Sequence, residues 1–401
     1  MATVNQVYAI VNSSANQALG SSAVTVTDTG SLVSLGDQIL SSDSNKEAFY
    51  NALTDRIGLT IVAVRDYEAR YRSIYRNGMD WGAVFQKISF TNSNAVENPS
   101  WIGDAQSSPF DVEGNITAKQ KLFSKISTWS NEEKIPDYQL RTAFTNAPAM
   151  SAFIDGIYMT MKNSMELEIE RVSALAVNTN IAGCLIKGVD NMKRDLLFEF
   201  NFAEGNVTET NTEIAGKTPL TMDKALKDAE FLKYASKEIN NVLYNIGGYS
   251  SVFNAEGMPR HTPKDKAVLE VLNEFASASD VYLQSNTYHK ELTALPNYER
   301  VPYWQGSGES FTFADCSSIS ISNASLVTSE NKTGEVTQNG IIAFLHDIDS
   351  CASTMYDRRS TSMYNPRSEV NVYMEKATVG YAVDLSENAV VFYMTNPKPT
   401  E

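Results

Sequence analysis

A group of potential metal ligands stands late in the chain, where the sequence reads His346-Asp347-Ile348-Asp349. Because successive side chains of a strand point to opposite faces, Asp347 and Asp349 would share one face. A protein metal site needs roughly three or four ligands, and the other two histidines, His261 and His289, stand at no metal-binding spacing. The pattern favours a strand that ends in a polar loop, and we expect no metal and no other cofactor.

Two further motifs approach nucleotide-binding and hydrolase patterns without completing them. Gly216-Lys217-Thr218 resembles the end of a phosphate-binding loop, but Asn211 stands where that loop requires glycine. Pro219 follows at once, where the phosphate-binding helix would begin, so a surface turn is the better interpretation. The run Gly248–Val252 does not complete a G-x-S-x-G nucleophile elbow. We therefore expect no catalytic residues and no enzyme activity.

Tyrosines and arginines alternate in the stretch YEARYRSIYRNGMDWG, which covers residues 67–82. Its aromatic and basic members are Tyr67, Arg70, Tyr71, Arg72, Tyr75, Arg76 and Trp81. This mixture is typical of nucleic-acid surfaces, but Tyr, Trp and Arg also dominate protein interfaces. The formal net charge is −15, from 48 acidic and 33 basic residues, and such a chain repels polyanions except at local patches.

The composition is that of an ordinary globular protein, with 42% hydrophobic and 20% charged residues among 401. Such a chain can bury a sizeable core in one large or several smaller domains. Its three cysteines, Cys184, Cys316 and Cys351, favour reduced, buried thiols, with a disulfide as the alternative. Residues 1–45 lack Lys and Arg, so they do not read as a secretory signal. No apolar run approaches the roughly 18–20 residues of a membrane span.

The N-terminal elements are expected to be a polar arm, a short helix and a buried strand. Residues 1–45 have little apolar surface to bury, although VTVTDTGSLVSLG alternates enough to add a strand to another surface. Ser44 would cap a helix that has Phe49 and Leu53 on one face and ends near Gly58. The β-branched stretch LTIVAV that follows is typical of a buried strand.

Residues 89–138 contain only seven Leu, Ile or Val residues, too few to build a core of their own. Three of the four tryptophans of the chain, Trp81, Trp101 and Trp129, nevertheless lie between residues 81 and 129. Large aromatic side chains without a core indicate anchors for another surface. A disordered insertion is the alternative, but such segments are depleted in aromatic residues.

The clearest element is a long helix that should begin at Pro148 after an Asn146 cap. Apolar residues recur along it at Met150, Ile154, Ile157, Met161, Met165, Ile169, Val172 and Ala176. Their period of about 3.7 is helical, and about 30 residues would span about 45 Å. We expect a strut that lies across a sheet or a neighbouring element, with a core helix of an all-α domain as the alternative.

Short strands and amphipathic helices follow one another irregularly over residues 186–350. DLLFEFNF, SISISNASLV and GIIAFLHD are expected strands, and helices are expected from Thr221 and from Thr262 or Pro263. After Asn365-Pro366-Arg367 the segments EVNVYM, VGYAVDL and AVVFYMT should form a closing meander. The fold class is therefore α+β with a mixed sheet.

Four segments in chain order resemble the major capsid proteins of small short-tailed bacteriophages of Gram-positive hosts, the podovirus and picovirus-like group. They are FYNALTDRIGLTIVAV with the basic-aromatic run to GMDWGAVFQKI, LRTAFTNAPAMSAFIDGIYMTMKNSMELE, PKDKAVLEVLNEFASASDVYLQSNTYHKELTALPNYERVPYW, and NPRSEVNVYMEKATVGYAVDLSENAVVFYM. The resemblance covers most of residues 46–395 and depends on the colinear set, not on any single motif. Residues 1–45 and about 305–340 have no counterpart in it.

The resemblance implies the Hong Kong 97-type phage capsid fold. Its parts would be an N-terminal arm (1–45), the first part of the peripheral domain (46–64), an extended loop (65–138), the peripheral domain with its long spine helix (139–185), an axial domain (186–350), and the closing strands of the peripheral domain with the C-terminus (351–401). The extended loop would lie over a neighbouring subunit. It would contact that subunit through the seven residues named above in the 67–82 stretch, together with Trp101 and Trp129.

The resemblance also implies a function. The chain would form pentamers and hexamers of an icosahedral shell around double-stranded phage DNA, which it would contact non-specifically. Other expected partners are a scaffolding protein, a portal protein and minor head or decoration proteins, without any membrane. Because residues 1–45 are too short for a scaffolding segment, the scaffold would be a separate protein. Assembly in the host bacterial cytoplasm would yield the virion capsid, and Trp81→Ala or Arg76→Ala should block it while the monomer stays folded.

Two other functions stay open at the level of sequence. An encapsulin-like compartment shell shares the implied fold and would hold a cargo enzyme in place of DNA. A soluble enzyme or ligand-binding protein with a motif-free site would instead form a small oligomer with a concave pocket.

Overall fold

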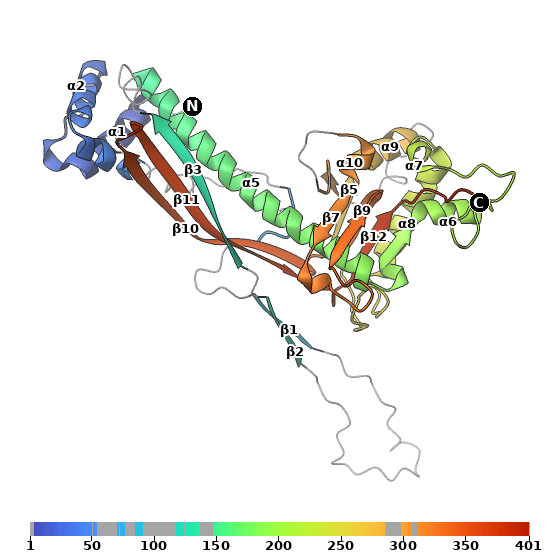
Figure 1. Cartoon of the computed structure of the whole chain (residues 1–401). Helices are drawn as coiled ribbons and strands as arrows, with labels where there is room; N and C mark the ends of the chain where they lie inside the picture. The colour runs from blue at the N-terminus through green and yellow to red at the C-terminus, as the bar shows by residue number, and fades with distance from the viewer. Residues whose placement is uncertain are drawn as a thin grey trace, which may run out of the picture. The chain divides into compact units, whose positions relative to one another are not determined.

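The computed structural model divides the chain into two compact units, both discontinuous in sequence (Figure 1). The first unit contains Met1–Gly82, Ile126–Ser173 and Ser353–Gly380, and the second contains Ala83–Lys125, Ala174–Ala352 and Tyr381–Glu401. The residues whose structure is described are 4–49, 51–53, 70–71, 73–76, 85–90, 118–123, 126–136, 147–284, 298–305 and 311–400. Each unit has its own hydrophobic core.

The N-terminal segment is helical, so the strand expected in VTVTDTGSLVSLG is wrong. Its helices are α1 (Val4–Leu19) and α2 (Thr29–Leu40), with the 3₁₀ turn η1 (Gly20–Ser22) between them. Asp28 caps α2 by accepting from the Ser31 amide at 2.7 Å, in a reciprocal capping box. Leu32, Leu35 and Ile39 then fall at helical spacing and are fully buried. The cap and this spacing outweigh the β-propensity of the preceding valines and threonines.

A third helix covers residues 43–49 and 51–53. Ser42 caps it, two residues before the expected Ser44, because the Ser42 hydroxyl accepts from the Asn45 amide at 3.3 Å. Phe49 and Leu53 are buried as predicted and join the core that α1 and α2 form. The predicted end of this helix and the LTIVAV strand lie outside the described residues.

The first unit also contains a three-stranded sheet and most of a very long helix. The sheet order is β10 (Cys351–Asn365), β11 (Val370–Val383), β3 (Ile126–Pro136), and β3 pairs antiparallel with β11 along its whole length. The predicted long helix is confirmed as α5 (Ala147–Lys187), whose 41 residues correspond to about 60 Å. Ser173 of α5 hydrogen-bonds Ser353 of β10 at 2.7 Å, so the helix lies against the sheet as a strut (Figure 1).

The second unit is built on a five-stranded mixed sheet. In sheet order its strands are β4 (Lys193–Asp195), β12 (Ala389–Tyr393), β9 (Ile341–Asp347), β5 (Ala267–Leu272) and β6 (Glu299–Val301). β4 runs parallel to β12 and β6 parallel to β5, whereas β9 is antiparallel to both of its neighbours. This arrangement confirms the expected mixture of helices with a mixed sheet.

Helices pack their apolar faces against this sheet. They are α6 (Leu196–Ala203), α7 (Met222–Ala225), α8 (Ala229–Asn245), α9 (Asn273–Gln284) and α10 (Phe313–Cys316), with the 3₁₀ turns η3 (Asp190–Met192) and η5 (Ala324–Leu326). Phe231 and Ile239 of α8 and Phe275 of α9 join Leu345 and Phe392 of the sheet in one buried core. A separate two-stranded ribbon consists of β7 (Ile319–Ser322) and β8 (Glu335–Gln338).

Two predictions for this unit were wrong, because side-chain caps determine where its helices begin. DLLFEFNF is the helix α6 and not a strand, since Asp195 accepts from the Phe198 amide at 3.0 Å. The single helix expected from Thr221 is divided into α7 and α8. Asp228 caps α8 by accepting from the Phe231 amide at 2.8 Å.

A third correction concerns the helix expected from Thr262 or Pro263, which begins only at Asn273. The apolar run AVLEVL before it pairs with β9 as the strand β5. The strand expected in SISISNASLV is confirmed only over its first half, as β7, because the second half contains the 3₁₀ turn η5. The strands expected in GIIAFLHD and AVVFYMT are confirmed as β9 and β12, whereas EVNVYM and VGYAVDL form one continuous strand, β11. The three cysteines are buried and free, as predicted. In the described part of the chain, no helix is long and apolar enough to cross a membrane.

Candidate functional site

The strands β1 (Phe85–Phe90) and β2 (Ala118–Phe123) form a two-stranded antiparallel ribbon in the second unit. We call this pair the β1–β2 ribbon. Side chains of a strand alternate between its faces, so the ribbon has a lysine face and an apolar face. Among the described side chains, the lysine face carries Lys87, Ser89, Lys119 and Lys121 with Phe123 at its end, and the apolar face carries Ile88, Phe90, Ala118, Gln120 and Leu122.

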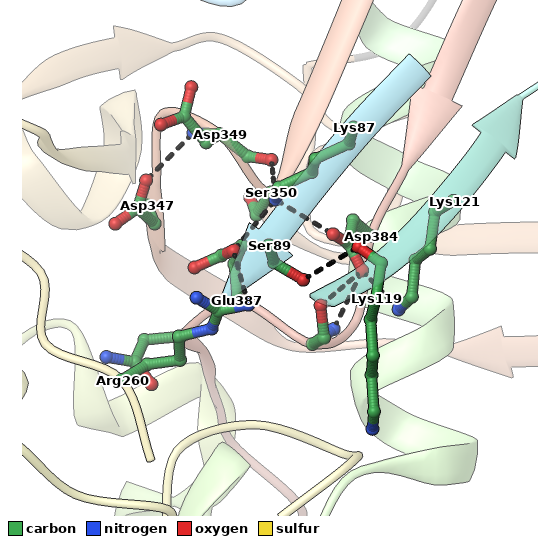
Figure 2. Close-up of polar contacts among 12 residues, drawn as sticks. Lys87, Ser89, Lys119, Lys121, Arg260, Asp347, Asp349, Ser350, Asp384 and Glu387 are labelled. Carbon is green, nitrogen blue, oxygen red and sulfur yellow. Dashed lines mark hydrogen bonds and ion pairs between the residues drawn. The ribbon is translucent and has the colours of Figure 1, made fainter. Parts of the chain in front are cut away.

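The lysine face is anchored on the second unit by a set of ion pairs (Figure 2). The Lys87 ammonium lies 2.8 Å from Asp384 Oδ2 and 2.8 Å from Glu387 Oε1, and it donates to the carbonyl oxygen of Asp349 at 3.0 Å. The Lys121 ammonium lies 2.7 Å from Asp384 Oδ1 and also pairs with Glu256. We call the group of Lys87, Lys121, Asp384, Glu387 and Glu256 the ribbon latch.

Asp384 is the centre of the ribbon latch. Its side chain is only 3% exposed and also accepts from the Ser386 amide and hydroxyl at 3.0 and 2.7 Å. Burial raises the pKa of Asp384, but Lys87 and Lys121 more than offset this effect and hold it below its ordinary value of 3.8. The carboxylate is therefore ionised at neutral pH and has a cation on each oxygen.

The charges of the ribbon latch are balanced when Arg260 is included. An Arg260 nitrogen, Nη2, lies 3.6 Å from Glu387 Oε1, so three cations face the three anions of the group. Burial lowers the pKa of Lys121, but its bonds to Asp384 and Glu256 raise it above the ordinary 10.5. Lys87 and Lys121 are about three-quarters buried, which weakens solvent screening of these pairs.

The apolar face of the ribbon points the other way and is largely exposed. Ile88, Phe90 and Leu122 are 54%, 61% and 62% exposed. An ordinary ribbon on a protein surface buries its apolar side and presents its charges to water. The β1–β2 ribbon does the reverse, and an exposed apolar patch of this kind marks a surface that another molecule covers.

The residues predicted for contact in the 67–82 stretch are described only in part. Tyr67, Arg72, Trp81 and the later Trp101 lie outside the described residues. Arg70, in the first unit, places Nε 3.1 Å from Glu170 Oε1 on α5. Tyr71 is 2% exposed and has a positive φ of 60°.

Tyr75 and Arg76 lie beside the start of β10. Tyr75 forms a parallel bridge with Ser353, and the Arg76 amide donates to the Ser353 carbonyl oxygen at 2.9 Å. Arg76 is exposed. The structure therefore brings the described members of the stretch together in the first unit, next to α5 and β10.

Trp129 belongs to β3, in the three-stranded sheet of the first unit. Its indole nitrogen donates to Ser127 Oγ at 3.0 Å. Its ring lines a pocket that Met165 of α5 and Met355 of β10 also line, together with Glu375 of β11. The side chain is half-buried in its own unit.

The lysines of the ribbon latch were not among the residues predicted from sequence. The alternation of Lys119, Gln120 and Lys121 does place two lysines on one face of a strand. Their acidic partner Asp384 follows 263 residues after Lys121, however, and nothing local in the sequence joins the two.

The potential metal ligands at 346–349 take a different role. His346 is buried at the end of β9, and its Nδ1 lies 3.0 Å from Ser350 Oγ while its Nε2 lies 3.6 Å from Glu270. This order of groups is that of a Ser-His-acid triad, but all three residues are fully buried and no substrate can reach Ser350. Among the described residues, no group of His, Cys, Asp and Glu is arranged to hold a metal ion.

The run Gly216-Lys217-Thr218, which resembles the end of a phosphate-binding loop, forms a turn. Gly216 has a φ of +82°, and the Lys217 amide donates to the Ile214 carbonyl at 3.0 Å. A positive φ suits glycine and supports the surface-turn interpretation of Gly216-Lys217-Thr218.

Comparisons with known proteins give a family and a fold. Residues 9–393 match the family model described as Phi29-like phage major capsid protein. A structure titled as the capsid structure of Staphylococcus phage Andhra is similar at 8% identity and a TM-score of 0.50, covering 83% of this chain and 87% of that one. A second, titled for the head fiber and inner core protein gp22 of native bacteriophage P68, has 9% identity, a TM-score of 0.50 and the same coverages. At such identities the likeness shows the fold alone, and a comparison with curated proteins gives no match.

Proposed function

Because the chain belongs to the family of Phi29-like phage major capsid proteins and forms the shell of a phage capsid, we propose that the β1–β2 ribbon is the root of an extended loop that joins neighbouring subunits. The single observation that carries this proposal is the reversed orientation of the ribbon. Lys87 and Lys121 pair with Asp384 of the same unit, and the apolar face of the ribbon is exposed. In a shell of identical copies, the neighbouring subunit is the partner always present to cover that face.

The ribbon latch supports this role because it fixes the root of the loop. An exposed two-stranded ribbon is only marginally stable by itself. Two ammonium groups on one buried carboxylate hold both strands to the second unit, so the apolar face is presented in one orientation. Preorganisation of this kind lowers the entropy cost of binding a neighbour.

We assign the finer organisation of the shell subunit to the Hong Kong 97 type, in the form found in small short-tailed phages. The extended loop would be 65–138, the spine helix would be α5 within 139–185, and the axial domain would be 186–350. Support comes from the length of α5 and from the mixed sheet of the second unit. The arm would be 1–45, here two capped helices, with the closing strands in 351–401.

The contact residues of the loop would be those predicted from the sequence, joined by the apolar face of the ribbon. Tyr67, Arg70, Tyr71, Arg72, Tyr75, Arg76, Trp81, Trp101 and Trp129 would meet or position the neighbour, and Ile88, Phe90 and Leu122 would pack against it. Aromatic residues and arginine are the types that dominate such interfaces. For Arg70 and Tyr71, which are engaged within the first unit, the role would be to position the loop.

The other partners follow from a phage shell. Copies would form pentamers and hexamers with a separate scaffolding protein and a portal protein, assembled in the bacterial cytoplasm, and minor head or decoration proteins would bind afterwards. The shell would enclose double-stranded DNA. With a net charge of −15, contact with that DNA would be weak and non-specific.

Cryo-electron microscopy of the full-length chain, expressed alone and with its candidate scaffold, tests the proposal. We expect closed icosahedral shells in which Ile88, Phe90 and Leu122 of each copy lie against the next copy. Shells in which this face stays open to solvent would refute the role of the ribbon and leave the shell function intact. A monodisperse monomer or dimer under both conditions would count against assembly by this chain.

A further inference from the structure

A histidine and a glutamate face each other inside the core of the second unit. His346 lies on β9 and Glu270 on the adjacent β5, as diagonal neighbours on one face of the sheet. Both side chains are 0% exposed, and His346 Nε2 lies 3.6 Å from Glu270 Oε1. Within the described part of the chain, neither carboxylate oxygen of Glu270 has a hydrogen-bond partner, and nor has His346 Nε2. A lone carboxylate in such a place would be strongly unfavourable.

The other nitrogen of His346 fixes its tautomer. Nδ1 lies 2.8 Å from the carbonyl oxygen of Asp347, which can only accept a hydrogen bond, so Nδ1 carries a hydrogen. Ser350 Oγ, at 3.0 Å, is a second neighbour of the same nitrogen and accepts from Asn180 Nδ2 at 3.0 Å. The charge state of the ring is therefore decided at Nε2, which faces Glu270.

We propose that His346 and Glu270 share one proton in the folded chain at neutral pH, so that folding of the second unit takes up a proton that the unfolded chain releases. The proton can reside on Nε2, as imidazolium beside carboxylate, or on Oε1, as carboxylic acid beside imidazole. In both forms the pair has no net charge, so no uncompensated charge is buried. The inference does not depend on the shell function.

Cys351 and Glu299 are titratable groups that act on the pair, and both favour a retained proton. Cys351 of β10 places Sγ 3.9 Å from Nδ1, the nitrogen already committed to Asp347. Asp347 itself accepts from Thr262 Oγ1 at 2.8 Å and from the Asp349 amide at 2.9 Å. Burial raises the pKa of Cys184 on α5, which keeps this thiol neutral. Glu299 on β6 is an acid whose charge raises the pKa of Glu270.

The pKa shifts of His346 and Glu270 agree with a proton that the pair retains. Burial lowers the pKa of His346, but Cys351 and Glu270 raise it, and the result lies well above the ordinary 6.5. Burial also raises the pKa of Glu270 above 4.5. Stabilisation from a raised pKa is fully present below the unfolded value, here pH 6.5, and is lost as pH rises through the folded value. Over that interval one additional bound proton makes the unfolding constant rise about tenfold per pH unit.

Urea unfolding of the full-length chain between pH 7 and 9.5 tests the proposal against Glu270→Gln. The amide of this variant can donate to a neutral His346 but cannot share a proton, so the variant should lack the alkaline loss of stability. We expect the ratio of the wild-type to the variant unfolding constant to rise about tenfold per pH unit. Parallel pH profiles for the two chains would overturn the proposal.

Two further measurements keep the test decisive if the variant does not fold. Cys351→Ser should retain the wild-type pH profile, and a flat profile there would mean that the thiol, not Glu270, is the partner. Nitrogen-15 NMR of histidine-labelled wild-type chain at pH 8 should show Nε2 of His346 bearing or sharing a proton. A free Nε2 lone pair at pH 8, with an ordinary titration near pH 6.5, would refute the shared proton.

Discussion

Lys87 and Lys121 are directly opposite each other on antiparallel strands, and their ammonium groups bind the two oxygens of one carboxylate, that of Asp384. Like charges at directly opposite positions destabilise a strand pair. The buried carboxylate between them converts this repulsion into the attachment of the ribbon to the second unit. Asp384 therefore links both strands to the rest of the unit, whereas Glu387 pairs with Lys87 and Glu256 with Lys121.

Asp384→Asn should release the ribbon, because it leaves two lysines facing each other without their shared anion. We expect a loss of about 2–3 kcal/mol in the free energy of unfolding, below the usual cost of breaking a fully buried pair because both lysines retain some exposure. Urea unfolding gives the magnitude. Hydrogen exchange should show that protection is lost first in β1 and β2.

Asp349→Asn is the matched control for this substitution. Asp349 also pairs with a lysine, Lys266, but both side chains are exposed, at 38% and 51%. Surface pairs of this kind contribute about 0–1 kcal/mol, so the control should stay close to wild type. Equal effects of the two substitutions would show that Asp384 has no special role.

The ribbon latch should open only at strongly acidic pH. The pKa of Asp384 lies below its ordinary 3.8 in the folded chain, so its stabilisation is present above about pH 3.8 and is lost as pH falls towards the folded value. Hydrogen exchange of β1 and β2, corrected for intrinsic rates, should be constant from pH 7 to about 4 and accelerate below. Asp384→Asn should remove this acid-dependent step, and an opening already complete at pH 5 in wild type would contradict the assignment.

The elements that the sequence predicts correctly are those whose pattern is long or continuous. The helix α5 repeats its apolar spacing at eight positions from Met150 to Ala176, so no single residue decides its identification. The strand β9 is an uninterrupted buried run, and so is β12 except at its last residue. Where one cap decides the structure, as Asp28 does for α2 and Asp195 for α6, the propensity of neighbouring residues suggests a strand instead.

The ribbon latch was not predicted from the sequence, for a different reason. The sequence places aromatic and basic residues in the 67–82 stretch and singles out the tryptophans, but it does not reveal which chain segments meet. Lys121 and Asp384 contact each other only because the fold brings residues 263 positions apart together. The exposure of the apolar face likewise cannot be predicted from the sequence, because it follows from the contacts of the lysines on the opposite face. The period of apolar residues is a local property of the sequence, whereas the partner that each face contacts is set by the tertiary fold.

Arg70 and Arg76 should behave differently when each is replaced by alanine. Arg70 pairs with Glu170 in its own unit at partly exposed positions, so Arg70→Ala should lower the free energy of unfolding by about 1 kcal/mol or less. Arg76 is exposed, and its backbone amide, which the substitution keeps, is bonded to Ser353. Contacts of exposed charged side chains contribute about 0–1 kcal/mol, so Arg76→Ala should lower the free energy of unfolding by about 1 kcal/mol or less and reduce shell assembly in sedimentation assays. Normal shells from Arg76→Ala would remove it from the contact surface.

Polar substitutions on the apolar face of the ribbon should uncouple folding from assembly. Phe90 and Leu122 are more than half exposed, so Phe90→Ser with Leu122→Ser should change the free energy of unfolding by no more than about 0.5 kcal/mol. If a neighbouring copy covers this face, the same pair of changes removes most of the apolar area that the ribbon contributes, and shells should not form. Phe90→Leu, which keeps the face apolar, is the control and should assemble. Sedimentation velocity and electron microscopy distinguish the outcomes: shells of normal yield from the double variant would mean that subunits are held together elsewhere on the chain.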